Sequence, residues 1–175
     1  MLATISQRLK HYMPSAAESE VDNAATKAAV MLLLQGDPLD PHVILTKRAN
    51  HLNHHAGEVA FPGGMKEPCD QNLLATALRE TEEEIGLTSD KIELLGMLPS
   101  DSPRLSKLRV APFMGWVASP YHLQPDPSEI AAVFNFPLKL LLDTGGYKYF
   151  ELSERKIQLP YVKYGEYKIW GFTLK

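Results

Sequence analysis

Glu80, Glu83 and Glu84 follow Arg79 in the segment R-E-T-E-E-E-I-G-L. Residues three and four apart are neighbours on a helix, so these carboxylates would gather along one side of it. Like charges at that spacing repel each other unless a cation or an arginine neutralises them. Carboxylate oxygens are the ligands that hard divalent cations prefer. The pattern therefore suggests a metal site, and the alternative is a solvated acidic face.

The two ends of this helix are marked by glycines. Pro62-Gly63-Gly64 forms a turn before the helix, and Gly86 is expected to end it. Glycine lets a backbone approach a ligand closely or adopt positive φ, so a carbonyl of the turn, assigned to Gly64, is a candidate ligand. Arg79 lies one turn before Glu83 and is expected to orient it through a charge-assisted hydrogen bond. These fixed ends favour the metal-site interpretation.

This stretch resembles the signature of the Nudix hydrolases. The residues at the family's spacing are Arg79, Glu80, Glu83, Glu84, Gly86 and Leu87. Asp70 corresponds to the family's upstream acid, and Thr81 stands where an aliphatic residue is usual. The preceding segment Leu45–Gly64 reads L-T-K-R-A-N-H-L-N-H-H-A-G-E-V-A-F-P-G-G and resembles the extra motif of the coenzyme A pyrophosphatase branch. Asn53 takes a position that is usually basic in that branch.

The resemblance implies hydrolysis of a diphosphate that joins a nucleoside to another group, with Mg²⁺ or Mn²⁺ as cofactor. The implied metal ligands are Glu80, Glu83, Glu84 and Gly64. Arg79 would orient the site, and either Glu83 or Glu129 would take the proton; the sequence does not choose between them. The implied substrate contacts are Arg48, Leu52, Asn53, His55, Gly57 and Gly63.

The branch motif implies coenzyme A or an acyl-CoA as the small-molecule nucleotide substrate, cleaved to 3′,5′-ADP and 4′-phosphopantetheine. Two alternatives remain open. One is a related pyrophosphatase acting on ADP-ribose or dinucleoside polyphosphates, and the other is a nucleotide-binding sensor without catalysis. The intact set of glutamates argues against the sensor, because a binder needs no charge cluster that requires a metal.

Composition narrows the remaining function classes. The chain has 175 residues, 22% charged residues and a net charge of −3, which suits one globular domain. We find no Lys/Arg cluster interleaved with aromatic residues and expect no nucleic-acid partner. No apolar run is long enough for a membrane helix, and we expect no membrane association. Cys69 is the only cysteine, which fits a reducing compartment and a cytoplasmic location.

The surrounding elements must position these residues. Residues 1–25 are expected to form an amphipathic helix over about residues 2–13 and a linker. The helix would pack on the domain or on a second subunit, so a homodimer is one expected assembly. Residues 26–175 are expected to form the catalytic domain, in which a mixed sheet lies between helices. This is an α/β fold, and the resemblance implies the Nudix-type α/β/α sandwich.

The remaining segments are assigned by their apolar patterns and turn residues. Loop Ala49–Ala56 carries three histidines whose spacing matches no zinc motif, so we expect the loop to face a ligand. A short helix is expected over Pro137–Leu142. The chain stops at Lys175, and the sequence leaves open whether the family's last helix is absent. Strands are expected at Ala28–Leu34, Val43–Arg48, Val59–Phe61, Lys91–Leu98, Leu108–Ala118, Tyr147–Leu152, Lys156–Leu159 and Tyr167–Phe172.

Overall fold

The computed structural model describes residues 1–9, 26–102, 108–118, 121–152 and 156–174. The expected linker and residues 10–13 of the expected first helix lie outside these residues. So do Arg104 and Lys107, two basic residues that the sequence offers as possible phosphate contacts. Among the residues that are described, no helix is both long and apolar enough to span a membrane.

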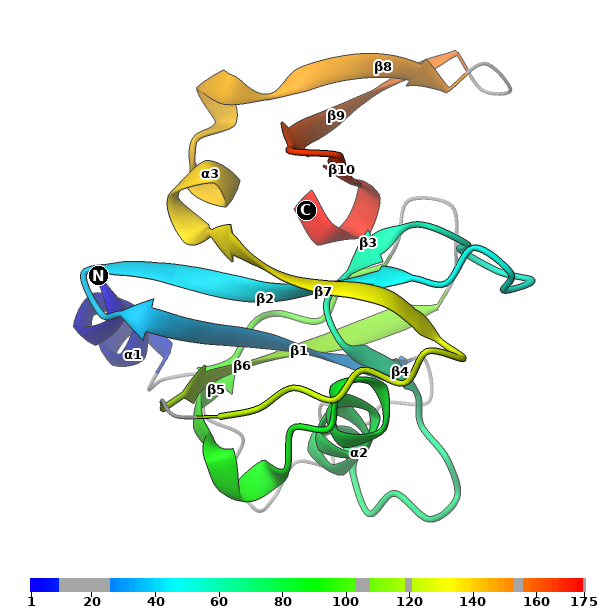
Figure 1. Cartoon of the computed structure of the whole chain (residues 1–175). Helices are drawn as coiled ribbons and strands as arrows, with labels where there is room; N and C mark the ends of the chain where they lie inside the picture. The colour runs from blue at the N-terminus through cyan, green and yellow to red at the C-terminus, as the bar shows by residue number, and fades with distance from the viewer. Residues whose placement is uncertain (10–25, 103–107, 119–120, 153–155, 175) are drawn as a thin grey trace.

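A mixed sheet of seven strands forms the centre of the molecule (Figure 1). Its main path runs in the order β3-β2-β1-β6-β5, while β4 pairs with β1 and β7 pairs with β2. The central pair β1 and β6 is parallel, and the other pairs are antiparallel. The strands are β1 (Thr26–Asp37), β2 (Asp40–Arg48), β3 (Val59–Ala60), β4 (Gly63–Met65), β5 (Ile92–Met97), β6 (Arg109–Val117) and β7 (Ile130–Pro137).

A second, antiparallel sheet of three strands, in the order β10-β9-β8, was not expected from the sequence. It consists of β8 (Lys148–Leu152), β9 (Ile157–Tyr164) and β10 (Tyr167–Trp170). The predicted hairpin between the first two strands is confirmed by their antiparallel register. Val162 and Ile169 turn inward from this sheet and are buried in the core. The short 3₁₀ helix η4 (Gly171–Leu174) follows it.

Helices cover both faces of the large sheet, so the predicted α/β sandwich is confirmed. The helix α2 (Leu73–Ile85) packs on one face, over a core that includes Met31 and Ile44. The opposite face is covered by α1 (Leu2–Leu9), α3 (Leu138–Leu142) and the small sheet. Figure 1 shows α2 below the large sheet and the small sheet above it. The small sheet therefore shares with α1 and α3 a layer that we expected to be helical.

Several boundaries differ from those expected, and strands β4 and β7 were not predicted. Lys91 ends the 3₁₀ helix η2 (Ser89–Lys91) rather than starting β5. Pro137 ends β7, and α3 begins one residue later. A further 3₁₀ helix, η3 (Thr144–Gly146), follows α3.

The helix α2 ends at Gly86 as its sequence predicts, but it begins at Leu73 after a cap at Asn72 that was not predicted. Asn72 caps its start by accepting a hydrogen bond from the Ala75 amide at 2.9 Å, and Gly86 ends it with φ of 70°. Helical spacing predicts an inward stripe of Leu74, Leu78, Thr81 and Ile85. The observed stripe is displaced from it, since Leu74 and Leu78 are only half-buried. The buried residues of the helix are Leu73, Thr76, Ala77, Thr81, Glu84 and Ile85. The displacement turns a carboxylate, Glu84, into the interior.

Leu9 tests whether α1 belongs to the domain core. Its side chain is 6% exposed and lies against Gly96 of β5. Leu9→Ala should lower the free energy of unfolding by about 2–5 kcal/mol, because it leaves a cavity in a packed core. Leu39 is 75% exposed, and Leu39→Ala should change the same free energy by less than about 0.5 kcal/mol. Urea denaturation measures both, and equal effects would show that α1 contributes nothing to the core.

Candidate active site

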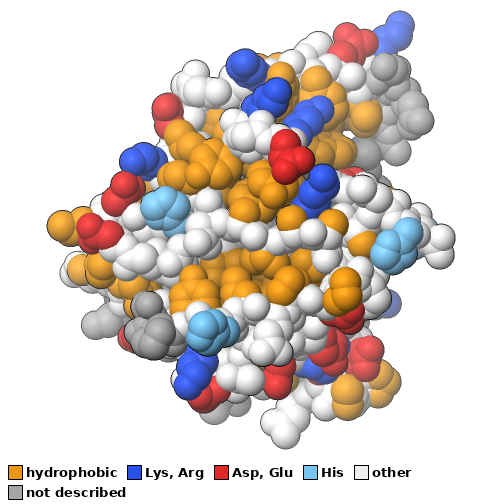
Figure 2. All heavy atoms as spheres, viewed as in Figure 1, with side chains coloured by type: hydrophobic (Ala, Val, Ile, Leu, Met, Phe, Trp, Pro, Cys, Tyr) orange, Lys and Arg blue, Asp and Glu red, His pale blue; other side chains and the backbone are white. Residues whose placement is uncertain are grey.

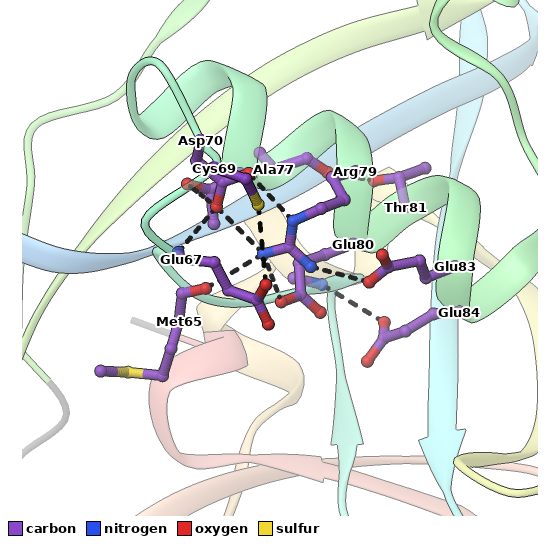
Figure 3. A network of polar contacts seen from close by, with 12 residues as sticks. Met65, Glu67, Cys69, Asp70, Ala77, Arg79, Glu80, Thr81, Glu83 and Glu84 are labelled. Carbon is purple, nitrogen blue, oxygen red and sulfur yellow. Dashed lines mark hydrogen bonds and ion pairs between the residues drawn. The ribbon is translucent and has the colours of Figure 1, made fainter.

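Arg79 joins the loop before α2 to the carboxylates along the helix (Figure 3). Its guanidinium donates two hydrogen bonds to Asp70, from Nε to Oδ1 at 2.9 Å and from Nη2 to Oδ2 at 3.0 Å. It also donates to Glu80 at 3.0 Å, to Glu83 at 2.7 Å and to the Met65 carbonyl at 3.2 Å. The paired bonds to Asp70 use the planar fork that only arginine has.

Asp70 fixes this arginine from a buried position. Its carboxylate also accepts hydrogen bonds from the Glu67 amide at 2.8 Å and from the Thr76 hydroxyl at 3.0 Å. The hydrogen bonds from Arg79 hold the pKa of Asp70 at about 2, against the opposing effect of burial. Its ionised form therefore stabilises the fold above pH about 4, and this contribution is lost as the pH falls through about 2.

Glu84 is the buried carboxylate of the site and is only 3% exposed. Its Oε1 lies 3.3 Å from Nη1 of Arg48, and its Oε2 accepts a hydrogen bond from the Gly63 amide at 3.3 Å. Burial raises the pKa of Glu84 to about 8, although Arg48 and the Gly63 amide act in the opposite direction. The side chain is therefore protonated or ionised according to pH in the neutral range.

Glu80 occupies the space that Gly64 leaves open. A Cβ added at Gly64 would lie 2.5 Å from the Glu80 carboxyl group, so only glycine allows this approach. Burial raises the pKa of Glu80, and Arg79 partly offsets that effect. Glu83, in contrast, is 59% exposed and points to Arg79. The expected hydrogen bond between Arg79 and Glu83 is thus present, and Asp70 is the further partner that we did not predict for this arginine.

Gly63 and Gly64 lie in strand β4, which pairs with β1, and not in the turn expected from Pro62-Gly63-Gly64. Gly63 allows β4 to lie close against the β1 backbone. Its φ is 149°, and an added Cβ would lie 2.3 Å from the Ala29 carbonyl oxygen. No other residue can take this conformation so close to a backbone without displacing it. The close approach brings the Gly63 amide within reach of Glu84.

The loop between β2 and β3 is tied to the segment that carries Glu129. The Ala49 amide donates to the Glu129 carbonyl at 2.7 Å, and a ring nitrogen of His51 lies 3.0 Å from the Ser128 carbonyl oxygen. The charge of Glu129 contributes to the raised pKa of both Glu80 and Glu84. Its carboxylate forms no hydrogen bond or ion pair with the described residues. The charge of Glu129 therefore acts on the carboxylates of α2, and its own carboxylate has no partner among the described residues.

The remaining predicted contact residues lie in this loop, away from the buried glutamate. Asn53 is exposed and Leu52 is half-buried. His55 has φ of 55°, and its Nδ1 lies 3.0 Å from the Glu58 carboxylate. Gly57 has φ of 70° and passes close to Asn50, where a side chain would meet Oδ1 at 2.8 Å. Of the six predicted contacts, the structure brings only Arg48 and Gly63 against the carboxylates of α2.

The donor types fit a hard divalent cation. Glu80 and Glu84 supply carboxylate oxygens and lie one helical turn apart. Both side chains are shielded from solvent, next to Gly63 and Gly64, which have no side chains to fill the space. In the described part of the chain, however, no three acidic, histidine or cysteine side chains converge as a finished metal site. Arg48 and Arg79 hold the carboxylates instead. Holding a cation therefore requires these carboxylates to turn from their arginines.

Comparisons with known proteins identify relatives that match most of this chain. Residues 25–155 match the NUDIX domain family. The Nudix hydrolase NudL of Photorhabdus laumondii is 38% identical over 148 residues, which are 83% of this chain and 78% of the relative. The M. smegmatis Nudix hydrolase RenU matches with a TM-score of 0.55 at 20% identity, covering 68% of this chain and 74% of that one. The NUDIX domain of Shewanella oneidensis NrtR, solved with ADP-ribose, matches with a TM-score of 0.50 at 22% identity, covering 73% and 82%.

The buried Glu84 predicts a pH-dependent stability in the absence of metal. Its pKa rises from 4.5 to about 8 on folding, so its protonation stabilises the fold fully below pH about 4.5 and no longer above about 8. Glu84→Gln removes this titration. With a chelator present, the melting temperature of the variant relative to the unmodified chain should therefore rise as the pH increases from about 5 to 9.

Glu82→Gln is the matched control, because Glu82 is exposed on the same helix. Its melting temperature relative to the unmodified chain should not change with pH over that range. A Glu84→Gln variant with the same pH dependence as the control would show that Glu84 is ionised throughout.

Proposed function

The chain belongs to the Nudix hydrolase family, and we propose that it hydrolyses the diphosphate of coenzyme A or an acyl-CoA to 3′,5′-ADP and (acyl-)4′-phosphopantetheine. One observation carries the proposal. Arg48 and Gly63, which belong to the segment resembling the coenzyme A branch, both contact Glu84 of the Nudix helix. The two motifs therefore meet at one carboxylate, as a shared reaction centre requires.

Glu80 and Glu84 are proposed to hold the divalent cation, with Glu83 and the Gly64 carbonyl as further ligands. Mg²⁺ or Mn²⁺, when bound, neutralises the charge that builds up on the phosphate oxygens and polarises the attacking water. Arg79 keeps Glu80 and Glu83 on the side of the helix that faces the glycine turn. Arg48, once released by Glu84, is a cation available to a phosphate oxygen.

Glu129 is proposed as the proton acceptor. The sequence left this role open between Glu83 and Glu129. Glu83 is held by Arg79 at 2.7 Å, whereas Glu129 has no side-chain partner among the described residues and adds its charge to the same cluster. A general base must be free to approach the attacking water, and that requirement favours Glu129.

The loop between β2 and β3 is proposed to recognise the part of the substrate beyond the diphosphate. Its two positive-φ residues, His55 and Gly57, give it a defined shape, and Asn53 projects from it into solvent. The main rival substrate is ADP-ribose, the ligand with which the NrtR neighbour was solved. Dinucleoside polyphosphates form a second rival class of substrate, and nucleotide sensing without catalysis is the rival function.

Loss of the Glu84 charge should abolish most turnover. Glu84→Gln should lower kcat by roughly 10²-fold or more, on the scale of removing a key stabiliser of transition-state charge. The assay follows product mass for a panel of nucleoside diphosphates with Mg²⁺ or Mn²⁺. Glu82→Gln should keep kcat within about twofold, since Glu82 is exposed and outside the cluster. Normal turnover by Glu84→Gln would remove Glu84 from the reaction.

Substrate preference tests the coenzyme A assignment. We expect kcat/KM for coenzyme A to exceed that for ADP-ribose by about 10–100-fold, because ADP-ribose lacks the pantetheine arm and the 3′-phosphate. Such a ratio corresponds to one lost charge-assisted hydrogen bond. Asn53→Arg should widen the preference for coenzyme A over dephospho-CoA, because it adds a cation where the 3′-phosphate is expected.

Asn135→Arg is the control, since Asn135 is exposed on β7, away from the loop. It should leave the preference between coenzyme A and dephospho-CoA unchanged. Equal rates on coenzyme A, dephospho-CoA and ADP-ribose would assign the chain to the broader nucleoside diphosphate class.

A further inference from the structure

The outer face of the small sheet interleaves lysines with aromatic rings. Residues opposite each other in a ladder share a face, and side chains alternate along each strand. Lys163 pairs with Lys168, and Trp170 pairs with Tyr161, which in turn pairs with Lys148 on β8. The register therefore places these lysines and rings on one face, opposite to the face of Val162 and Ile169, and Leu159, which pairs with Phe150, is buried among them. The lysines and rings of this face are Lys148, Phe150, Tyr161, Lys163, Lys168 and Trp170.

Lys168 covers the aromatic rings of this face. Its Nζ lies 3.3 Å from the ring centroid of Phe150, 4.9 Å from that of Tyr161 and 5.8 Å from that of Trp170. The rings are arranged edge to face around the ammonium group, with Phe150 and Trp170 at 5.4 Å and an interplanar angle of 81°. The chain thus supplies its own cation to an aromatic surface that attracts cations.

A hollow of about 280 Å³ opens at the same place. Its walls are Phe150, Tyr161, Lys163, Glu166, Tyr167 and Lys168. Among the described residues, none of the three lysines on this face forms an ion pair. Figure 2 shows basic and acidic side chains among hydrophobic side chains in the upper part of the molecule, where Figure 1 places β8–β10. The hollow therefore combines flat apolar walls with the positive charges of Lys163 and Lys168 and the single negative charge of Glu166.

We propose that this hollow binds a nucleotide, with its base on the aromatic rings and its phosphate on Lys163 and Lys168. Bases stack on aromatic side chains without needing a particular sequence of contacts, and lysines attract phosphate. A base that takes the place of the Lys168 ammonium on Phe150 releases that ammonium to the phosphate. A cationic ligand is disfavoured here, because Lys168 already occupies the rings and Lys163 would repel it.

The position of the hollow admits two sources for this nucleotide. Tyr167, one of its walls, stacks on Phe134 of β7 with ring centroids 3.9 Å apart, and Lys47 of β2 lies over the same ring. Lys47 is the neighbour of Arg48, which contacts Glu84. The hollow therefore adjoins the strand that reaches the proposed reaction centre. It takes either the nucleotide end of the proposed substrate or a separate nucleotide.

The test measures binding of 3′,5′-ADP and 5′-AMP to the full chain by calorimetry, with a chelator present so that no turnover occurs. Lys168→Glu should raise the dissociation constant by roughly tenfold, because it reverses the charge offered to the phosphate. Phe150→Leu keeps an apolar side chain but removes the ring face, and it should also raise the constant by roughly tenfold, the scale of one lost base stack. Lys91→Glu makes the same charge change on η2 and should leave the constant unchanged.

Hydrolysis of coenzyme A by the same variants separates the two sources. If Lys168→Glu raises KM and leaves kcat unchanged, the hollow binds the nucleotide end of the substrate. If KM is unchanged while 5′-AMP binds more weakly, the hollow binds a separate nucleotide. The proposal is overturned if the dissociation constants of Lys168→Glu and Phe150→Leu equal that of Lys91→Glu while all three melt normally. It is also overturned if a short single-stranded oligonucleotide binds far more tightly than either mononucleotide.

The inference rests on the proposed function only for the choice of 3′,5′-ADP as a probe. The unmodified chain could hydrolyse coenzyme A while the variants bind nucleotides with unchanged dissociation constants. That result would reject the inference and keep the proposed function. Weaker nucleotide binding in Lys168→Glu without any hydrolysis of coenzyme A would do the reverse.

Discussion

The carboxylate of Glu84 is buried, and the surrounding strands supply the partners that a buried carboxylate requires. An isolated buried charge is costly, so its oxygens need partners. Arg48 reaches one oxygen from the end of β2, and the Gly63 amide reaches the other. The amide can do so only because Gly63 lies against the Ala29 backbone without a side chain. The contacts of this single ionisable group thus link β2, β4 and α2.

Arg79, held by Asp70, supplies hydrogen bonds to the more exposed carboxylates, Glu80 and Glu83. The paired hydrogen bonds from the guanidinium to Asp70 hold the Arg79 side chain in place. Asp70 is itself held by hydrogen bonds from the Thr76 hydroxyl and the Glu67 amide. Two arginines therefore balance four acidic side chains of α2 and the loop before it. This balance explains how a helix with so many like charges can pack tightly against a sheet.

The local part of this arrangement could be predicted from the sequence, and the long-range part could not. The end of α2 at Gly86 and the contact between Arg79 and Glu83 follow from spacing along the chain, whereas the pairing of Gly63 and Gly64 with β1 does not. The burial of Glu84 did not follow, because helical arithmetic defines stripes and not which stripe faces inward. The small sheet was missed for a similar reason, since three short strands do not reveal that they leave the main sheet. The alternation of lysine and aromatic residues in Tyr161–Trp170 was also overlooked. Phe150 is distant in sequence and joins these residues only when β8 pairs with β9.

The parallel pairing of β1 with β6 also constrains how the chain reaches this fold. Leu34 pairs with Trp116, so the centre of the sheet joins segments that are far apart in sequence. Pairings of this kind must close a long loop before they contribute any stability, and they slow folding. The helix that carries the glutamates lies within that loop. During synthesis, α2 therefore leaves the ribosome before its sheet is complete, and its charged face must remain in solution until β6 arrives.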